Sequence, residues 1–88
     1  MDYMDEMSYY HLYIKTSCGF CKKAIDLLME KGEEFAITVL DHSEILEKYV
    51  KEDFSHNTVP IVLLANVEED VEDEFIGGYT ELEESFNE

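Results

Sequence analysis

The stretch KTSCGFCKKA, residues 15–24, holds two cysteines three positions apart and three lysines. The run before it, Tyr9 to Ile14, is aromatic and β-branched, which predicts a buried strand. From Cys21 onward, apolar residues recur at helical spacing and predict a helix of about three turns that stops at Gly32. The cysteine pair is therefore expected where the first strand turns into the first helix.

The rest of the chain predicts three further strands and two further helices. A strand, helix, strand unit of this length implies a parallel pair, and two later strands joined locally must then add antiparallel. The expected fold is α/β, a small four-stranded mixed sheet flanked by about three helices. The further elements are a strand at 35–40, a helix opened by an Asp41 and Glu44 capping box and running to Phe54, strands at 59–64 and 74–76, and a short helix within 80–88.

Length and charge limit the classes of function. The 88 residues suit one domain, at 8–88, after an acidic N-terminal tail at 1–7. The 22 acidic residues against 6 lysines give a net charge of −16, which excludes nucleic acid as a partner and opposes binding to anionic membranes. The start, MDYMDEMSYY, has acids where a secretory signal has lysine or arginine. Two cysteines do not make a disulfide scaffold, so a reducing, cytoplasmic location is expected.

Three chemistries suit a CxxC pair. A structural zinc site needs two further ligands, but His11, His42 and His56 are scattered singly without ligand spacing. A purely structural disulfide is disfavoured, because closing so short a loop removes little chain entropy. Thiol redox chemistry remains, since CxxC beside a strand, helix, strand pattern is a thioredoxin-like signal.

The position of the pair favours this chemistry. Unpaired N–H groups at a helix start stabilise an anion, so a thiol there loses its proton more easily. Cys18 is thus the better attacking thiolate, whereas Cys21 lies one turn inside and is shielded. Residues 8–25 contain no acid, and Lys15, at the strand end, is expected to point across the helix start at the sulfur. Lys22 and Lys23 could equally well solvate the helix face.

Three motifs in this order resemble the glutaredoxin family: KTSCGFC at 15–21, TVP at 58–60 and GGYTEL at 77–82. The resemblance covers about residues 9 to 86 and implies a thioredoxin-like fold with glutathione-dependent thiol-disulfide exchange. It makes Cys18 the nucleophile and Cys21 the resolving cysteine. It also implies a monomer whose partners are glutathione and disulfide-containing or glutathionylated proteins, with ribonucleotide reductase as a typical substrate.

The resemblance also implies a glutathione site. A cis Val59-Pro60 bond would let the main chain of Val59 pair with glutathione, although an ordinary edge-strand proline is the alternative. Thr80 is expected to cap the last helix, whose amides at 81 and 82 would receive the γ-glutamyl carboxylate. Glu81 stands where the family usually has aspartate. The residues implied for the site are Lys15, Phe20, Thr58, Val59, Pro60, Gly78, Tyr79, Thr80 and Glu81.

Two other functions stay open. Gly19-Phe20 resembles the monothiol class, in which the cysteine at Cys18 would ligate an iron-sulfur cluster between two chains; that class has serine where Cys21 stands and usually a tryptophan, which this chain lacks. The second is a thioredoxin-like reductant served by a flavoprotein reductase, against which Lys15 and the GGYTE segment argue. The acidic run EEDVEDE, residues 68–74, predicts a solvated hairpin or a surface for a basic partner.

Overall fold

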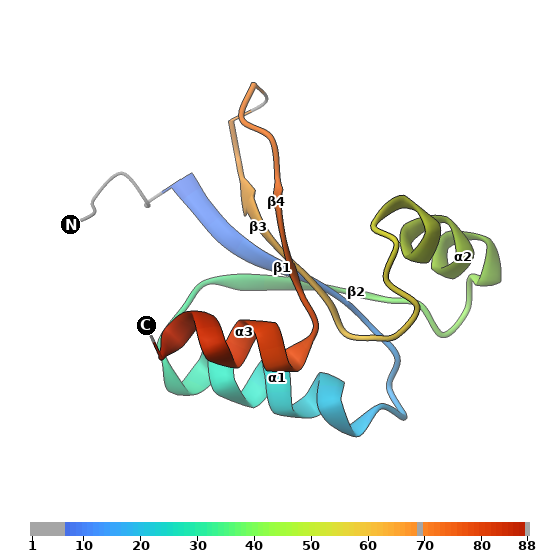
Figure 1. Ribbon diagram of the computed structural model, residues 1–88, viewed down its shortest axis with the longest axis horizontal. Coiled ribbons are helices and arrows are strands. Elements are labelled where there is room, and N and C mark those ends of the chain that lie inside the picture. The colour runs from blue at the N-terminus through green and yellow to red at the C-terminus, as the bar shows by residue number, and fades with distance from the viewer. Residues whose placement is uncertain (1–6, 69, 88) are drawn as a thin grey trace.

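The computed structural model describes residues 7–68 and 70–87, and in this part of the chain one sheet carries helices on both faces (Figure 1). The four strands lie in the order β2-β1-β3-β4. The elements are β1 (Ser8–Ile14), α1 (Gly19–Glu30), β2 (Phe35–Val39), α2 (Glu44–Asp53), β3 (Ile61–Asn66), β4 (Glu74–Gly77) and α3 (Tyr79–Phe86).

The strand directions are those predicted. β1 pairs in parallel with β2, with Leu12 opposite Ile37, and antiparallel with β3, where Leu12 lies opposite Val62. β4 joins β3 antiparallel. The α/β class, the mixed sheet of four strands and the three helices are therefore confirmed for the described residues.

The side chains of the central strands alternate between two apolar clusters, one on each face of the sheet. Leu12 and Ile14 pack with α1 and α3, whereas Tyr13, between them, packs on the α2 side. Successive residues of a strand point to opposite faces, so a single strand contributes to both clusters. Figure 1 shows α1 and α3 side by side on one face and α2 apart from them. Cys21 belongs to the α1 and α3 cluster, so the core fixes its position.

The capping box predicted from Asp41 and Glu44 is wrong. Ser43 is the N-cap of α2, and its Oγ accepts from the Leu46 N–H at 3.1 Å. The Asp41 carboxylate instead accepts from the Thr16 N–H at 3.0 Å and from the Thr16 hydroxyl. Asp41 is thus committed to the loop that leads into α1, and these hydrogen bonds lower its pKa.

The structure describes only part of the predicted N-terminal tail and of the acidic run at 68–74. Residues 1–6 of the predicted tail lie outside the described residues, and the Met7 carbonyl oxygen accepts from the Val67 N–H at 2.9 Å. In the predicted hairpin, position 69 lies outside the description, and Val71 N–H donates to the Glu68 carbonyl oxygen at 3.3 Å. Within the described residues, no helix has the length and apolar character needed to cross a membrane.

Candidate active site at the start of α1

The Cys18 sulfur is the N-cap of α1. Cys18 has extended backbone angles, and its Sγ accepts from the Cys21 N–H at 3.1 Å. Helix N-caps are usually oxygen side chains that satisfy such an amide, and here a sulfur takes that place. The half-buried Cys18 thiol also lies 3.5 Å from the Val59 carbonyl oxygen, to which it donates. An amide that donates to a sulfur stabilises negative charge on it, and the Cys21 N–H is placed to do so.

Cys21 has the opposite environment. Both cysteines are free thiols, but Cys21 is only 1% exposed. Burial, followed by the hydrogen bond to the Cys18 side chain, raises the pKa of the Cys21 thiol to about 12. The pair therefore consists of an accessible sulfur at the helix start and a shielded thiol one turn inside.

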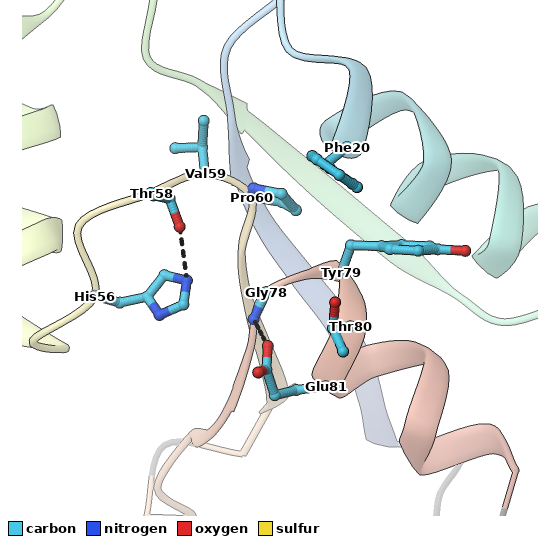
Figure 2. A pocket seen from close by; sticks show the side chains of 9 residues that line it. All are labelled: Phe20, His56, Thr58, Val59, Pro60, Gly78, Tyr79, Thr80 and Glu81. Atoms are coloured by element: carbon cyan, nitrogen blue, oxygen red, sulfur yellow. Dashed lines mark hydrogen bonds between the residues drawn. The ribbon is translucent and has the colours of Figure 1, made fainter.

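A cavity of about 320 Å³ opens beside this helix start (Figure 2). Three segments build it: the first turn of α1, the connection from α2 to β3, and the junction of β4 with α3. The Val59–Pro60 peptide bond at its wall is cis. The lining residues are Phe20, His56, Thr58, Val59, Pro60, Gly78, Tyr79, Thr80 and Glu81. The structure thus brings together all the residues implied for glutathione binding except Lys15, and adds His56.

Lys15 does not point at the Cys18 sulfur, so that expectation is wrong. Its ammonium pairs with Glu47 on α2, with Nζ 3.1 Å from Oε1. The same carboxylate accepts from Lys51 at 2.7 Å. These two hydrogen bonds lower the pKa of Glu47 and keep it charged. A role of Lys15 in ligand binding stays a prediction.

The other two lysines near the pair are also engaged. Lys22 forms an exposed ion pair with Asp26, one turn along α1, at 3.1 Å. The Lys23 ammonium lies over the Phe20 ring, 5.2 Å from its centre. Phe20 is 58% exposed and tilts against Tyr79, with ring centres 6.1 Å apart. These contacts give the rim of the site an aromatic pair with one cation above it.

Thr80 does not cap α3, contrary to the sequence-based expectation. The N-cap is Gly78, and Thr80 is the second residue of the helix. The Glu81 carboxylate folds back and accepts from the Gly78 N–H at 2.7 Å, and this hydrogen bond lowers the pKa of Glu81. The fold-back needs Gly77, whose φ is +131° and where a Cβ would lie 2.8 Å from the Glu81 Cβ.

His56 is the cavity residue that sequence reasoning missed. Its Nε2 lies 3.4 Å from the Thr58 Oγ1, and its ring meets Phe75 edge-on at 5.6 Å. Figure 2 shows the imidazole across the cavity from Gly78 and Glu81. The available signal was its position two residues before Thr58, in the connection that carries the TVP motif.

Metal ligands are not grouped in the described part of the chain. Among residues 7–68 and 70–87, no three His, Cys, Asp or Glu side chains are close enough together to hold a metal ion. The donors among the described residues therefore do not fit a metal cluster, and a cluster at Cys18 would need ligands from elsewhere.

The fold and the paired thiols define a thiol-disulfide oxidoreductase of the thioredoxin-like class. The family model described as Glutaredoxin matches residues 11–68, about two thirds of the chain. The chain therefore belongs to the glutaredoxin family. No curated protein matches it.

Solved structures with this fold include glutaredoxins from plants and bacteria. The holo form of glutaredoxin C1 from Populus tremula x tremuloides is 23% identical, with a TM-score of 0.74, over 89% of this chain and 73% of that one. A buckwheat glutaredoxin-glutathione complex is 20% identical, with a TM-score of 0.76, over 91% and 69%. Glutaredoxin 1 from Francisella tularensis, complexed with cacodylate, is 23% identical, with a TM-score of 0.70, over 91% and 93%. At these identities the likeness shows the fold.

Proposed function

We propose that this protein is a glutathione-dependent thiol-disulfide oxidoreductase of the cytoplasm, active as a monomer, with Cys18 as nucleophile and Cys21 as resolving cysteine. The observation that carries the proposal is the Cys18 sulfur at the N-cap of α1, 3.1 Å from the Cys21 amide nitrogen and beside the Val59 carbonyl. The substrates are protein disulfides and glutathionylated proteins, ribonucleotide reductase among the candidates.

The first step is attack by the Cys18 thiolate on a sulfur of the substrate disulfide. A new S–S bond forms at Cys18, the substrate S–S bond breaks, and the leaving thiolate takes a proton from solvent. The Cys21 N–H that stabilises the sulfur before attack is fixed by the helix and needs no rearrangement. The result is a mixed disulfide between Cys18 and glutathione or the substrate protein.

The second step has two routes. Where Cys18 holds glutathione, a glutathione thiolate from solution attacks the glutathione sulfur of the mixed disulfide, the bond to Cys18 breaks, oxidised glutathione leaves, and Cys18 returns as a thiolate. Alternatively Cys21 attacks the Cys18 sulfur, and an internal disulfide forms while the bound thiol leaves. Because Cys21 is buried and its pKa is raised, it is a thiol at neutral pH and must lose its proton as it attacks. The proton passes to the departing thiolate, so the charge does not accumulate in the core.

The cavity supports glutathione as the ligand. The buckwheat relative with the same fold is a glutathione complex. In this proposal the main chain of Val59 pairs with the tripeptide like an added strand, and Phe20 and Tyr79 form the apolar wall on the other side. The Glu81 carboxylate faces the ligand ammonium, with one oxygen held by the Gly78 amide.

The test of this function is turnover with glutathione. The purified protein, supplied with glutathione and its reductase, should reduce a small glutathione mixed disulfide continuously. No turnover, together with reduction of a protein disulfide by a flavoprotein reductase system, would contradict the proposal and favour the thioredoxin-like alternative. Visible absorbance after anaerobic reconstitution with iron and sulfide tests the cluster alternative, and a colourless product counts against it.

Replacing the resolving cysteine separates the two routes. Cys21→Ser should reduce protein-disulfide reduction by at least about tenfold, because the internal disulfide cannot form. Removal of glutathione from a glutathionylated protein should persist, since glutathione in solution completes that reaction. Loss of both activities in a variant with unchanged unfolding would show that the resolving cysteine is assigned wrongly.

A further inference from the structure

The α2 side of the sheet carries a row of three rings that the proposed function does not use. Tyr9, His11 and Tyr13 point to this side, because alternate residues of β1 lie on the same face. The His11 ring stacks on Tyr13 with ring centres 4.8 Å apart, and the Tyr9 ring centre lies 6.5 Å from that of His11. The His11 Nε2 lies 2.7 Å from the Thr38 Oγ1 on β2, and this hydrogen bond fixes the middle ring.

Within residues 7–68 and 70–87, a helix covers one end of this row and the other end is open. α2 packs over Leu40, Ile61 and Tyr13, near the end of β1. Figure 1 shows the beginning of β1, which carries Tyr9, well away from α2. The three rings are half-buried, so each keeps part of its surface in contact with solvent. Contiguous aromatic surface of this kind is a feature of binding sites.

Acidic groups from two segments border the row. Tyr49 and Asp53 are one turn apart on α2, so their side chains lie on the same side of the helix, and Tyr49 is 63% exposed. Burial is the first cause that raises the pKa of Tyr13, and the nearby charges of Asp73 and Asp53 follow it. Tyr49 acts in the same direction. The row therefore lies between a carboxylate from α2 and one from the connection that precedes β4.

No cation among the described residues neutralises these two carboxylates. None of the ion pairs in that part of the chain involves Asp53 or Asp73. Burial lowers the pKa of His11 below its ordinary value of 6.5, and the charge of Asp73 offsets this only in part, so the imidazole is uncharged at neutral pH. Lys48 and Lys51, the lysines of α2, instead line a separate hollow beside this helix. The rings thus lie in a region of negative potential, in a chain of net charge −16.

We propose that this aromatic surface binds an arginine-containing segment of a partner protein. A guanidinium is flat, so it can stack on a tyrosine or imidazole ring while its N–H groups donate to a carboxylate. The acidic run at 68–74 contains Asp73, and the charge of the whole chain attracts a basic segment. The inference does not depend on the proposed function, because no residue of this surface lines the cavity beside Cys18. The aromatic surface consists of Tyr9, His11, Tyr13, Tyr49, Asp53 and Asp73.

The experiment measures binding of a labelled peptide in which arginines alternate with glycine-serine spacers. Fluorescence anisotropy at about 0.15 M salt gives its Kd for the full chain and for each variant. Asp53→Asn combined with Asp73→Asn should weaken binding about tenfold, because both carboxylate acceptors are lost. Tyr49→Ala should weaken it about threefold, because one ring is lost from the stack. The same peptide with lysine in place of arginine should bind at least about threefold more weakly.

Matched controls separate this surface from the charge of the whole protein. Glu83→Gln combined with Glu84→Gln removes the same charge from α3, which packs on the other face of the sheet. This variant should stay within about twofold of the unaltered protein, because distant charges are screened at this salt concentration. Ile45→Ala removes a side chain that is 85% exposed, one turn before Tyr49 on the same helix, and should leave binding unchanged.

Three outcomes overturn the proposal. The first is no binding of the arginine peptide by the unaltered protein at this salt concentration. The second is equal weakening in the two double variants, which would show that net charge alone attracts the peptide. The third is equal binding of the lysine peptide, or a Tyr49→Ala variant that binds like Ile45→Ala, which would show that no guanidinium stacks on the rings. Turnover of a glutathione mixed disulfide should be the same in all these variants, so failure of the proposed function would appear separately, in the unaltered protein.

Discussion

Two helices begin at the same cavity, and they satisfy their first amides in different ways. At the start of α1 the cap is the Cys18 sulfur, which accepts from the amide of Cys21, three residues ahead. At the start of α3 the N-cap residue, Gly78, has no side chain, and the Glu81 carboxylate reaches back to its amide. In α1 the capping atom is the sulfur that is proposed to react. In α3 the capping group is a carboxylate from the first turn of the helix itself.

The difference explains why the two helix starts suit different tasks. The Cys18 sulfur accepts from an amide, which stabilises negative charge on a sulfur, and the residue is only half-buried. One oxygen of the Glu81 carboxylate instead accepts from the Gly78 N–H at the start of its own helix. The negative charge of the carboxylate remains beside the cavity. Under the proposed function, the α1 start presents the nucleophile and the α3 start presents an anion to the ammonium group of the ligand.

Exchanging the capping sulfur for oxygen tests the α1 side most strongly. Cys18→Ser should abolish turnover, with a loss of at least about 10³-fold, because a serine hydroxyl keeps its proton at neutral pH and is a poor nucleophile for sulfur. Serine is a favourable N-cap, so the free energy of unfolding should change by less than about 0.5 kcal/mol. Chemical denaturation measured beside the assay checks both, and a large loss of stability would contradict the role of the sulfur as a simple cap.

The α3 side is most sensitive at Gly77. Gly77→Ala should destabilise the protein by about 1–3 kcal/mol, because the residue has positive φ and the added Cβ would overlap the Glu81 side chain. The matched control is Gly19→Ala at the start of α1, where an added Cβ meets nothing within 4 Å. That variant should stay within about 0.5 kcal/mol in the same denaturation experiment. Similar losses in both would remove the contrast between the two helix starts.

The sequence predicted the elements well and their contacts poorly. The aromatic and β-branched run of β1 and the apolar stripe of α1 are local properties, so the strand, the helix and the position of the cysteine pair between them could be predicted. The helix caps could not be predicted, because the side-chain oxygen that accepts from a given amide depends on how the loops pack against one another. Asp41 serves Thr16, 25 residues away, and Ser43 takes its place at α2.

The same limit applies to charges and to the cavity. Lys15 finds Glu47 across 32 positions, a pairing that no local pattern indicates. The three motifs predicted most of the cavity residues, although they lie in separate segments of the chain. Each motif follows or precedes a strand at the same end of the sheet, so the fold brings them together. His56 was missed because its position two residues before Thr58 does not by itself show that the connection brings the imidazole beside Gly78.

Removing the carboxylate at α3 should have a smaller effect on stability than altering Gly77. Glu81→Ala should lower the free energy of unfolding by roughly 0.5–1 kcal/mol, because the Gly78 N–H loses its partner at the helix end. Glu81→Gln keeps an acceptor oxygen and should lose less. Thermal unfolding at neutral pH compares the three proteins, and equal melting temperatures would show that the carboxylate does not cap the helix.

The pH dependence of unfolding sharpens the same point. The pKa of Glu81 in the folded protein lies below its ordinary value of 4.5, so its contribution is present above that pH and is lost as the pH falls through the folded value. The difference in stability between the unaltered protein and Glu81→Gln should therefore shrink on acidification from about pH 6 to about pH 3. Asp41 and Glu47 titrate in both proteins and cancel in this difference. A constant difference would contradict the assignment.

The smallest effect is expected at Thr80, the residue that the sequence alone favoured as the cap. Thr80 is exposed and lies inside the first turn of α3, where the Gly78 amide is already taken by Glu81. Thr80→Ala should change the free energy of unfolding by less than about 0.5 kcal/mol, whereas Ser43→Ala, which removes the hydroxyl that caps α2, should cost about 1 kcal/mol. Denaturation of the two variants side by side decides between a capping hydroxyl and one that only borders the cavity. A loss at Thr80 as large as that at Ser43 would mean that a hydroxyl caps α3 as it caps α2, which would contradict the assignment of the Glu81 carboxylate as the group that satisfies the Gly78 amide.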